Sequence, residues 1–441
     1  MIGSFIENKI APMANKLARQ KYVQVIQSVF LTMIPFMTIG SFALILVSPA
    51  MDYKTMDPGL LRSFFQAWQS FADFAGGPLN AIFTASMGCL SLYVAVGLGY
   101  YLSKQYKMNT FLPTALCAVT FFIVNAIDSK GAITTQYFDG TGLFASMFVS
   151  ITTIELYRFL YERKVGRIEL SGAGVPPVLT ESFASIVPVL IVLVTMGLFS
   201  SAVFALSGGA FPNIMVVIMK PIVGMVDNVW GVLLLSVLVM VLWWFGIHDS
   251  VITGPLTPFL YNNLSANMTA YAAGTAAIAL PYVLTEPFWW TFMAIGGSGA
   301  TFGLCLLLLR SKSKQLKTVG KLAIVPAFFN INEPIIFGLP IMFNPTMMFP
   351  FVFAMTANGV ISYLMMQFHV IARTFAYPSW NMFCPIGALI STMDIKAVLL
   401  VIGLIIMDTL IYLPFFKIYE KQKLKEEQLD DSTAEQIGEL A

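Results

Sequence analysis

Charge is scarce in this chain of 441 residues: only 11% of them are Asp, Glu, Lys or Arg, whereas 57% are hydrophobic. Globular domains typically carry about 25% charged residues, so this composition argues against a domain surrounded by water. The formal net charge of +2 also gives no indication of nucleic-acid binding. The composition therefore predicts an integral membrane protein.

Cysteine and histidine are also rare, with 4 and 2 residues. The cysteines lie in apolar surroundings without CxxC spacing, as is typical of small side chains packed between helices: Cys89, Cys117, Cys305 and Cys384. No metal or cofactor site is predicted. The short alternating segments of a β-barrel are missing. No early apolar segment precedes Val23, so a cleavable signal peptide is not expected.

Long apolar stretches, in contrast, are abundant. A transmembrane helix needs about 20 predominantly apolar residues. Nine stretches are suitable: Ile26–Ser48, Leu79–Leu102, Phe111–Ile127, Leu143–Leu160, Phe183–Leu206, Val229–Ile247, Phe288–Leu309, Thr346–Met366 and Ala397–Phe416. A weaker tenth crossing is expected near Tyr271–Thr285. The sequence therefore predicts an all-α integral membrane protein with about ten transmembrane helices.

Basic residues predict the orientation, because Lys and Arg concentrate in cytoplasmic loops. They occur before the first span, in alternate loops and after the last span: within residues 9–21, 104–107, 158–167 and 310–321, and from 417 onward. Both termini are therefore expected in the cytoplasm.

The spans change in character along the chain. Residues 1–210 contain long uninterrupted spans, whereas residues 229–395 contain spans broken by proline and glycine, which in transporters indicate a binding site. Between them, Phe211–Asn228 is expected to be a surface or connecting helix. We predict an N-terminal scaffold and dimerisation domain over 1–210, a C-terminal transport domain over 211–416 and a charged cytoplasmic tail over 417–441.

The most specific motif lies in the broken half, where residues 330–340 read Asn-Ile-Asn-Glu-Pro-Ile-Ile-Phe-Gly-Leu-Pro. An ionisable residue in an apolar segment is costly and is usually kept for handling a substrate or an ion. The two prolines and the glycine argue against a plain spanning helix. Broken backbone at membrane depth persists where protein buries it or where it lines a cavity. Glu333 is therefore the first candidate for a site residue.

Three further ionisable residues lie beside broken segments, and each also has a purely structural interpretation. His248 ends an apolar run and can exchange a proton near neutral pH, although an interfacial histidine at a helix end has the same pattern. Asp249 could cap the next helical segment. Glu286 precedes Pro287, where a carboxylate often stabilises a helix N-terminus.

Polar and aromatic residues add to these candidates. Asn262 follows residues 251–259, whose glycine and two prolines predict a segment that turns back instead of crossing. Trp380 could stack against a substrate or belong to an interfacial tryptophan belt. Residues 295–303 read Ile-Gly-Gly-Ser-Gly-Ala-Thr-Phe-Gly. Without a following lysine or a preceding strand, this run favours close helix packing over phosphate binding.

Three stretches together resemble the membrane-embedded IIC components of bacterial sugar phosphotransferase systems, in the lactose/cellobiose (diacetylchitobiose) family. They are residues 246–248 (Gly-Ile-His), residues 295–301 and residues 330–340. In length and span pattern the resemblance extends over about residues 1–425. It implies a homodimer in the bacterial plasma membrane, with two re-entrant hairpin segments near Ser250–Asn267 and Lys321–Phe343.

The resemblance also implies roles for single residues. His248 and Glu333, as the catalytic pair, would face the sugar 6-hydroxyl that receives phosphate, and removing its proton suits an imidazole or a carboxylate. Asn332 and Trp380 would help to hold the sugar. The other candidates for sugar binding are the remaining polar residues of these segments: Asn330, Asp249, Asn262 and Glu286. Asp249 departs from the pattern, since glycine is expected after the histidine.

The function implied is a permease for a sugar, such as the β-linked disaccharides cellobiose or chitobiose. A separate IIB protein would donate the phosphate from a cysteine, supplied by IIA, HPr and enzyme I; no IIA or IIB domain is expected in the 25 residues after Phe416. Two alternatives are an ion-coupled transporter with Glu333, Glu286 and His248 as a proton relay, and a non-transporting sugar sensor. The asparagine-flanked carboxylate favours the permease over the ion-coupled transporter.

Overall fold

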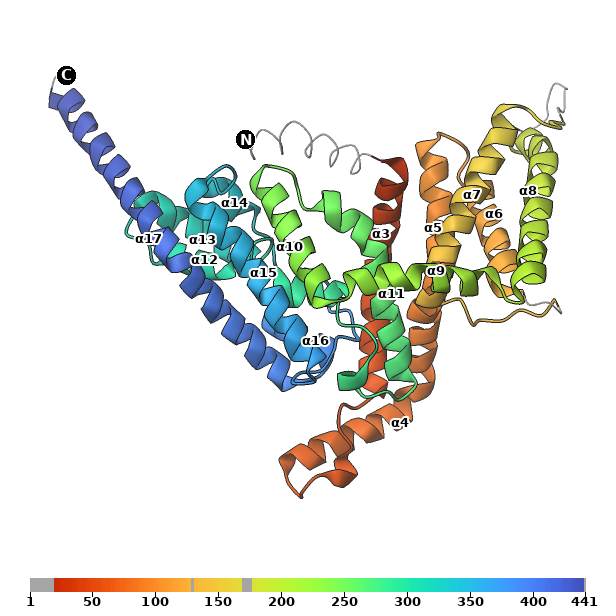
Figure 1. Cartoon of the computed structure of the whole chain (residues 1–441), viewed down its shortest axis with the longest axis horizontal. Coiled ribbons are helices and arrows are strands. Elements are labelled where there is room, and N and C mark those ends of the chain that lie inside the picture. The colour runs from red at the N-terminus through yellow and green to blue at the C-terminus, as the bar shows by residue number, and fades with distance from the viewer. Residues whose placement is uncertain (1–19, 128–130, 169–176, 440–441) are drawn as a thin grey trace.

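The computed structural model describes residues 20–127, 131–168 and 177–439. Within these ranges the chain forms helices and no strand longer than an isolated bridge, which confirms the all-α prediction (Figure 1). The N-terminal helices are α3 (Lys21–Val47), α4 (Leu60–Ser86), α5 (Leu90–Gln105), α6 (Phe111–Phe121), α7 (Leu143–Glu162) and α8 (Pro177–Ser207). A π-helical turn, Phe122–Ala126, extends α6.

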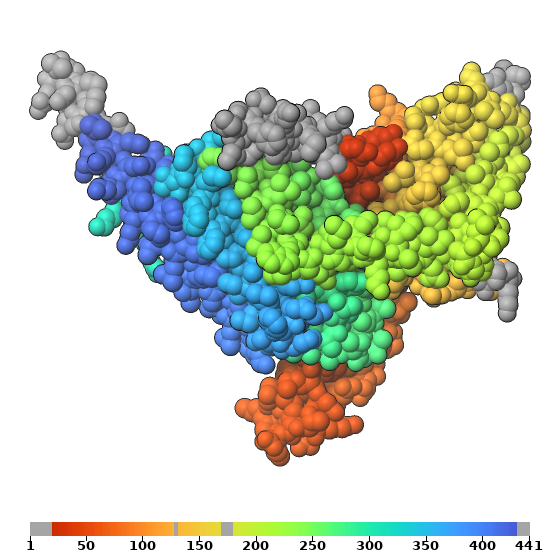
Figure 2. Space-filling view, viewed as in Figure 1, coloured from red at the N-terminus to blue at the C-terminus, as the bar shows by residue number. Residues whose placement is uncertain are grey.

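The predicted span Leu79–Leu102 is divided between two helices. Helix α4 begins much earlier, and a 3₁₀ turn at Met87–Cys89 separates it from α5. Figures 1 and 2 show α4 (orange) projecting from the body of the molecule. Many of its large apolar side chains are exposed, for example Leu60 and Phe74. Hydropathy did not reveal the division because the turn that makes it is as apolar as the helices beside it.

Helix α9 (Phe211–Val226) connects the two halves of the chain, as predicted. It runs across the molecule in Figure 1 between α8 and α10 (Val229–Trp244), and it meets α10 at an angle of 71°. Asn228 fixes this bend, because its side-chain oxygen accepts a hydrogen bond from the backbone N–H of Gly231 (2.9 Å).

Shorter and interrupted elements make up the C-terminal half. They are α11 (Ser250–Ala272), a π-helical turn (Phe288–Met293), α12 (Phe302–Leu309), α13 (Lys314–Phe328), α14 (Glu333–Gly338), α15 (Pro345–Gln367), α16 (Cys384–Thr392) and α17 (Ile395–Glu439). Their buried side chains form a large core that extends along the sequence from Val232 to Tyr419. Helices α13 and α14, joined by a turn, occupy the region predicted as the second hairpin.

Three predictions for this half are wrong. The segment Ser250–Asn267 does not turn back, because α11 is one continuous helix through both of its prolines. The weak crossing Tyr271–Thr285 is not helical beyond Ala272, apart from a short 3₁₀ turn. The span Phe288–Leu309 is interrupted at residues 294–301, where the glycine-rich run forms turns, although Gly299 and Gly303 still pack closely against α15 and α17.

Packing against the N-terminal half explains why α11 stays helical. The rings of Phe30 on α3 and Tyr261 on α11 stack with centroids 4.8 Å apart, and the Gln27 amide donates a hydrogen bond to the Ser250 carbonyl (3.1 Å). Leu264 belongs to the same core as α3 and α5. Tertiary contacts thus outweigh the loss of backbone hydrogen bonds at the prolines. As a result, α11 packs with residues on the other side of the predicted boundary at 210.

Six of the described helical segments are long and apolar enough to cross a membrane, or seven if α9 and α10 form one bent span. The six are Lys21–Val47, Leu60–Gln105, Gly140–Glu162, Thr180–Ser207, Pro345–Gln367 and Ile395–Leu429. Leucines face outward along them, for example Leu198 on α8 and Leu399 on α17, as contact with lipid requires. The total of about ten crossings stays a prediction.

The charged tail continues α17 and contacts the loop between α12 and α13. The Glu420 carboxylate accepts a hydrogen bond from the Ser311 hydroxyl (2.6 Å). Two helical turns later, Glu427 accepts hydrogen bonds from the Ser313 hydroxyl (2.7 Å) and the backbone N–H of Gln315 (2.9 Å). These carboxylates satisfy donors at the N-terminus of α13.

Candidate functional site

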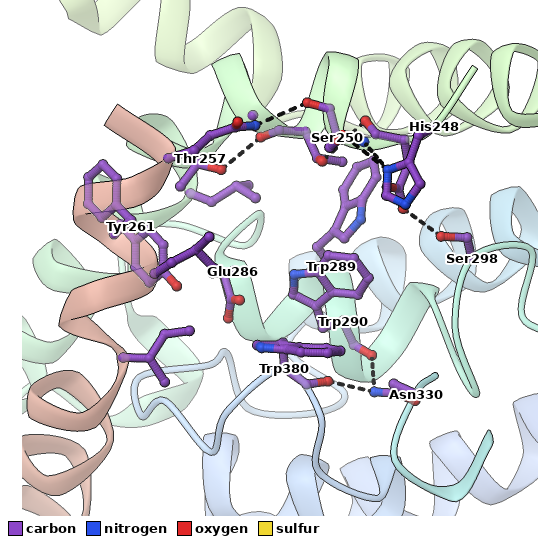
Figure 3. Close-up of a pocket in the computed structure, with 18 of the residues that line it drawn as sticks. His248, Ser250, Thr257, Tyr261, Glu286, Trp289, Trp290, Ser298, Asn330 and Trp380 are labelled. Carbon is purple, nitrogen blue, oxygen red and sulfur yellow. Dashed lines mark hydrogen bonds and ion pairs between the residues drawn. The ribbon is translucent and has the colours of Figure 1, made fainter. Parts of the chain in front are cut away.

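A cavity of about 320 Å³ brings most of the candidate site residues together (Figure 3). Its walls come from α3, α11, the π-helical turn Phe288–Met293, the glycine-rich run, the start of α14 and the loop before α16. Seven of the eight candidates line it: Glu333, His248, Asn332, Asn330, Trp380, Asp249 and Glu286. Asn262 does not, and its amide instead contacts the side chain of Asn263 (3.3 Å).

One part of the cavity combines aromatic rings with a buried carboxylate. Figure 3 shows Glu286 between Tyr261 and the tryptophans, and its side chain is buried. Its Oε1 accepts a hydrogen bond from the Tyr377 hydroxyl (3.4 Å), whereas Oε2 has no partner among the described residues. The rings of Trp290 and Trp380 lie 6.1 Å apart at 57°. These walls fit a ligand with apolar ring faces and hydroxyl edges.

The capping interpretation of Glu286 does not match this geometry. The backbone N–H of Phe288 donates a hydrogen bond to the Thr285 hydroxyl (3.3 Å), so Thr285 takes the position of the cap. The Glu286 carboxylate is left to face the cavity with one oxygen unused. An unpaired buried carboxylate oxygen is costly unless a ligand supplies a donor.

A tight turn at the end of α10 presents the histidine. Gly246 has φ +79°, and the N–H of Ile247 bonds to the Leu242 carbonyl (2.9 Å), as in a Schellman motif. The left-handed backbone favours glycine at this position. The turn ends α10 abruptly and places His248 in the loop at the edge of the cavity.

His248 and Asp249 form an ion-pair contact in this loop. The Nδ1 atom of His248 lies 2.9 Å from Oδ1 of Asp249, and the imidazole is 55% exposed while the carboxylate is 7% exposed. The hydrogen bond to Asp249 raises the pKa of His248, and the charge of Glu333 acts in the same direction. The imidazole is thus accessible and electrostatically tuned by two carboxylates.

Asn330 ends α13 and joins three segments around the cavity. Its φ is +58°, and the following N–H bonds to the Pro326 carbonyl (3.0 Å) in a second Schellman turn. Its side-chain oxygen accepts a hydrogen bond from the Gly296 N–H (2.8 Å), and its Nδ2 donates to the Trp380 carbonyl (2.9 Å; Figure 3). Because these groups are occupied by backbone, Asn330 shapes the cavity wall.

Asn332 fixes the glycine-rich run against the start of α14. Its amide Nδ2 donates hydrogen bonds to the Ser298 carbonyl (2.6 Å) and the Thr301 hydroxyl (2.9 Å). Gly297 has φ +99°, and a Cβ atom there would lie 2.5 Å from Cγ of Asn332. Glycine is therefore required for this close approach.

Glu333 begins α14 and differs from Glu286 in its surroundings. It is exposed, and its carboxylate has no hydrogen-bond partner in the described part of the chain. It lines the same cavity as the imidazole of His248. A free carboxylate and an accessible imidazole on one cavity are suited to taking a proton from a bound hydroxyl.

Other polar residues of the cavity were missed in the sequence. Gln27 on α3 and Thr253 and Thr257 on α11 line it. Gln27 could have been found as an amide within a predicted span. The threonines lie in the broken segment 251–259, and only the helix that this segment forms shows that both side chains share a face with the cavity.

A buried acid outside the cavity was also missed. Asp408 on α17 is fully buried, and its Oδ2 accepts a hydrogen bond from Asn358 on α15 (2.9 Å), whereas Oδ1 has no partner among the described residues. One turn later, the Tyr412 hydroxyl donates to the Gly299 carbonyl (2.6 Å). The hydrogen bond of Tyr412 holds the glycine-rich run against α17.

Comparison with known proteins identifies the family. Residues 27–354 match the family described as phosphotransferase system, EIIC. The chain belongs to this family. The crystal structure of ChbC, the IIC component of an N,N'-diacetylchitobiose-specific phosphotransferase system, has a TM-score of 0.87 and 30% identity, and the match covers 96% of this chain and 99% of ChbC.

Curated EIIC relatives match over nearly their full length. The cellobiose-specific EIIC component of Geobacillus stearothermophilus is 31% identical, over 98% of this chain and 97% of the relative. The oligo-beta-mannoside-specific EIIC component of Bacillus subtilis (strain 168) is 30% identical, over 98% of both. In the lactose-specific EIICB component of Lacticaseibacillus casei, at 26% identity, the match covers 98% of this chain but 73% of the relative. EIIC proteins are membrane permeases of sugar phosphotransferase systems, which implies a sugar substrate and a IIB partner for this chain.

Proposed function

We propose that this EIIC chain is a permease for a β-linked disaccharide of the cellobiose or diacetylchitobiose type. It binds the sugar and presents its 6-hydroxyl to a phosphorylated IIB protein. The names of the cellobiose, oligo-beta-mannoside and diacetylchitobiose relatives support the substrate class. The observation that carries the proposal is the cavity in which an aromatic wall, Glu286, His248 and Glu333 face the same space.

The parts of the cavity would serve different purposes. Trp290 and Trp380 stack against the apolar faces of the sugar rings, and the free oxygen of Glu286 accepts a hydrogen bond from a ring hydroxyl. Asn330 and Asn332 hold the walls at the spacing described above. His248 and Glu333 face the hydroxyl that reacts.

The transfer itself follows from the chemistry of the donor. The hydroxyl oxygen bonds to phosphorus while the S–P bond of the IIB phosphocysteine breaks and leaves a thiolate. The hydroxyl proton passes to His248 or Glu333. Phosphoryl transfer depends mainly on positioning and electrostatics, which these two side chains supply. The upstream donors would be IIA, HPr and enzyme I.

The assembly is part of the same proposal. The chain is a homodimer with both termini in the cytoplasm, a scaffold domain over 1–210 and a transport domain over 211–416. The exposed apolar residues of the projecting helix α4, Leu60, Phe64 and Phe74, support a surface that another copy covers.

Phosphoenolpyruvate-dependent sugar phosphorylation tests the function. Membranes that contain the chain are supplied with IIB, IIA, HPr and enzyme I, and phosphorylation of cellobiose, diacetylchitobiose and lactose is compared. Phosphorylation of a β-linked disaccharide, absent from membranes without the chain, is the expected result. Sugar binding without phosphorylation would instead support the sensor alternative.

A further inference from the structure

The carboxylate of Asp249 has no free oxygen for a sugar hydroxyl. Oδ1 lies 2.9 Å from Nδ1 of His248, and Oδ2 accepts a hydrogen bond from the Ser298 hydroxyl (2.6 Å). The side chain is 7% exposed. Glu286 offers an unused oxygen to the same cavity, so the two acids are arranged for different tasks.

We propose that Asp249 is a positioning residue for His248. It keeps a proton on Nδ1 of the imidazole and thereby leaves Nε2 as the acceptor for the proton of the sugar hydroxyl. Its catalytic consequence rests on the proposed function, whereas the arrangement of the pair does not. Asp249 also stands at the position where the family resemblance predicts a glycine.

The tautomer follows from the competition around Nδ1. The backbone N–H of Ser250 donates a hydrogen bond to this nitrogen (3.2 Å), and on its own this contact favours the ring proton on Nε2. The Asp249 carboxylate at 2.9 Å requires the opposite arrangement, with Nδ1–H as the donor. A charge-assisted hydrogen bond is roughly twice as strong as a neutral one, so the carboxylate decides the tautomer.

Among the described residues, the uncharged groups against the imidazole include the Ser250 hydroxyl, 3.0 Å from Nδ1, and the ring of Trp243 on α10, whose centroid lies 4.8 Å away at 52°. The charged groups that act on it are Asp249 from its own loop and Glu333 from α14. Loss of the Asp249 charge therefore leaves Glu333 as the remaining carboxylate that favours the imidazolium.

Asp249 also connects the two catalytic segments. Its Oδ2 holds the Ser298 side chain, and the Ser298 carbonyl accepts a hydrogen bond from Asn332 (2.6 Å), the residue before Glu333. The carboxylate therefore orients the imidazole relative to the segment that carries Glu333. Ligand-orienting carboxylates of this kind act on histidine in many sites through the nitrogen that does not react.

Carbethoxylation of histidine by diethylpyrocarbonate tests the pair without any need for catalysis, because the reagent attacks the neutral imidazole. The chain has two histidines, and the exposed His369 serves as a reference in the same sample. Full-length protein in detergent is labelled across pH 5–9, a range set by the ordinary pKa of about 6.5, and each site is quantified by mass spectrometry. The midpoint is the pH at which labelling of a histidine is half-maximal. In D249N this midpoint should move to lower pH for His248 and stay unchanged for His369.

S298A is the matched control, since it removes the hydrogen bond to Oδ2 and keeps the carboxylate beside His248. Its midpoint for His248 should not fall below that of the wild type. A D249N midpoint equal to that of the wild type would overturn the proposal. So would an equal fall in D249N and S298A, which would mean that Asp249 only anchors the loop.

Phosphorylation and binding complete the test. At pH 7, D249N should reduce the phosphorylation rate by on the order of 10²-fold, the contribution typical of a proton-accepting group, while the Kd for sugar changes by less than about 3-fold. A parallel loss of binding would overturn the positioning role. If the wild type shows the diethylpyrocarbonate behaviour but phosphorylates no sugar, the proposed function fails and the assignment of the pair stands.

Discussion

At the scale of single residues, Glu333 carries the most direct prediction. E333Q should reduce sugar phosphorylation by about 10²-fold or more, because the amide lacks the charge that favours the protonated imidazole of His248 beside the reacting hydroxyl. Insertion in the membrane should persist, since the exposed carboxylate has no partner to lose among the described residues. The measurement is the phosphorylation rate at matched expression, with N262A, which lies outside the cavity, as the control. Wild-type activity in E333Q would contradict the assignment.

Glu286 should act on binding. E286Q puts an amide in place of the carboxyl group, and the amide nitrogen cannot accept a hydrogen bond from a sugar hydroxyl; a polar group left unpaired in a buried site costs about 1–3 kcal/mol. The Kd for the sugar should therefore rise about 10- to 100-fold. Isothermal titration with purified protein measures this change. An unchanged Kd would mean that the free oxygen of Glu286 faces water instead of sugar.

The sequence located the candidate residues better than it explained them. Seven of eight line one cavity because ionisable and aromatic residues in broken apolar segments are rare and conspicuous. What could not be predicted is which polar atoms are already occupied. The amide of Asn330 is used by backbone of Gly296 and Trp380, and only the folded chain brings these residues together.

At the scale of elements, the glycine-rich run should be intolerant of side chains. G297A places a Cβ atom 2.5 Å from Cγ of Asn332, at a backbone φ of +99°. The strain should cost about 1–3 kcal/mol and lower the thermal unfolding midpoint in detergent. G197A in α8 is the matched control, because a Cβ atom there meets nothing within 4 Å. Equal midpoints for the two variants would show that the turn has room to adjust.

Hydropathy predicted most of the long apolar helices and failed at α11. Helices α3, α7, α8, α15 and α17 match predicted spans closely, because their apolar runs are long. Helix α11 does not, since its packing on α3 outweighs the helix-breaking tendency of Pro255 and Pro258. Local residue preferences cannot report contacts made with a distant helix.

At the scale of the whole molecule, the cavity lies where the two halves of the chain meet. Gln27 and Phe30 of α3 form one wall, and elements from α10 onward form the others. Helix α11 joins the two large buried cores, because Leu256 and Leu260 belong to the core of α10 and α12 to α17, whereas Leu264 belongs to the core of α3. The cavity is therefore held by a helix that packs with both halves of the chain.

The same organisation bears on the source of energy for uptake. We expect sugar accumulation in phosphoenolpyruvate-loaded vesicles to survive an uncoupler, because transfer of phosphate gives the product a charge that cannot return through an apolar path. Uptake is measured with labelled sugar, with and without the uncoupler, in vesicles that contain IIB, IIA, HPr and enzyme I. Vesicles without phosphoenolpyruvate are the control and should reach only the external concentration. Accumulation that the uncoupler abolishes would favour the ion-coupled alternative, and the buried Asp408 would then become the first residue to replace, since its unpartnered oxygen lies within α17.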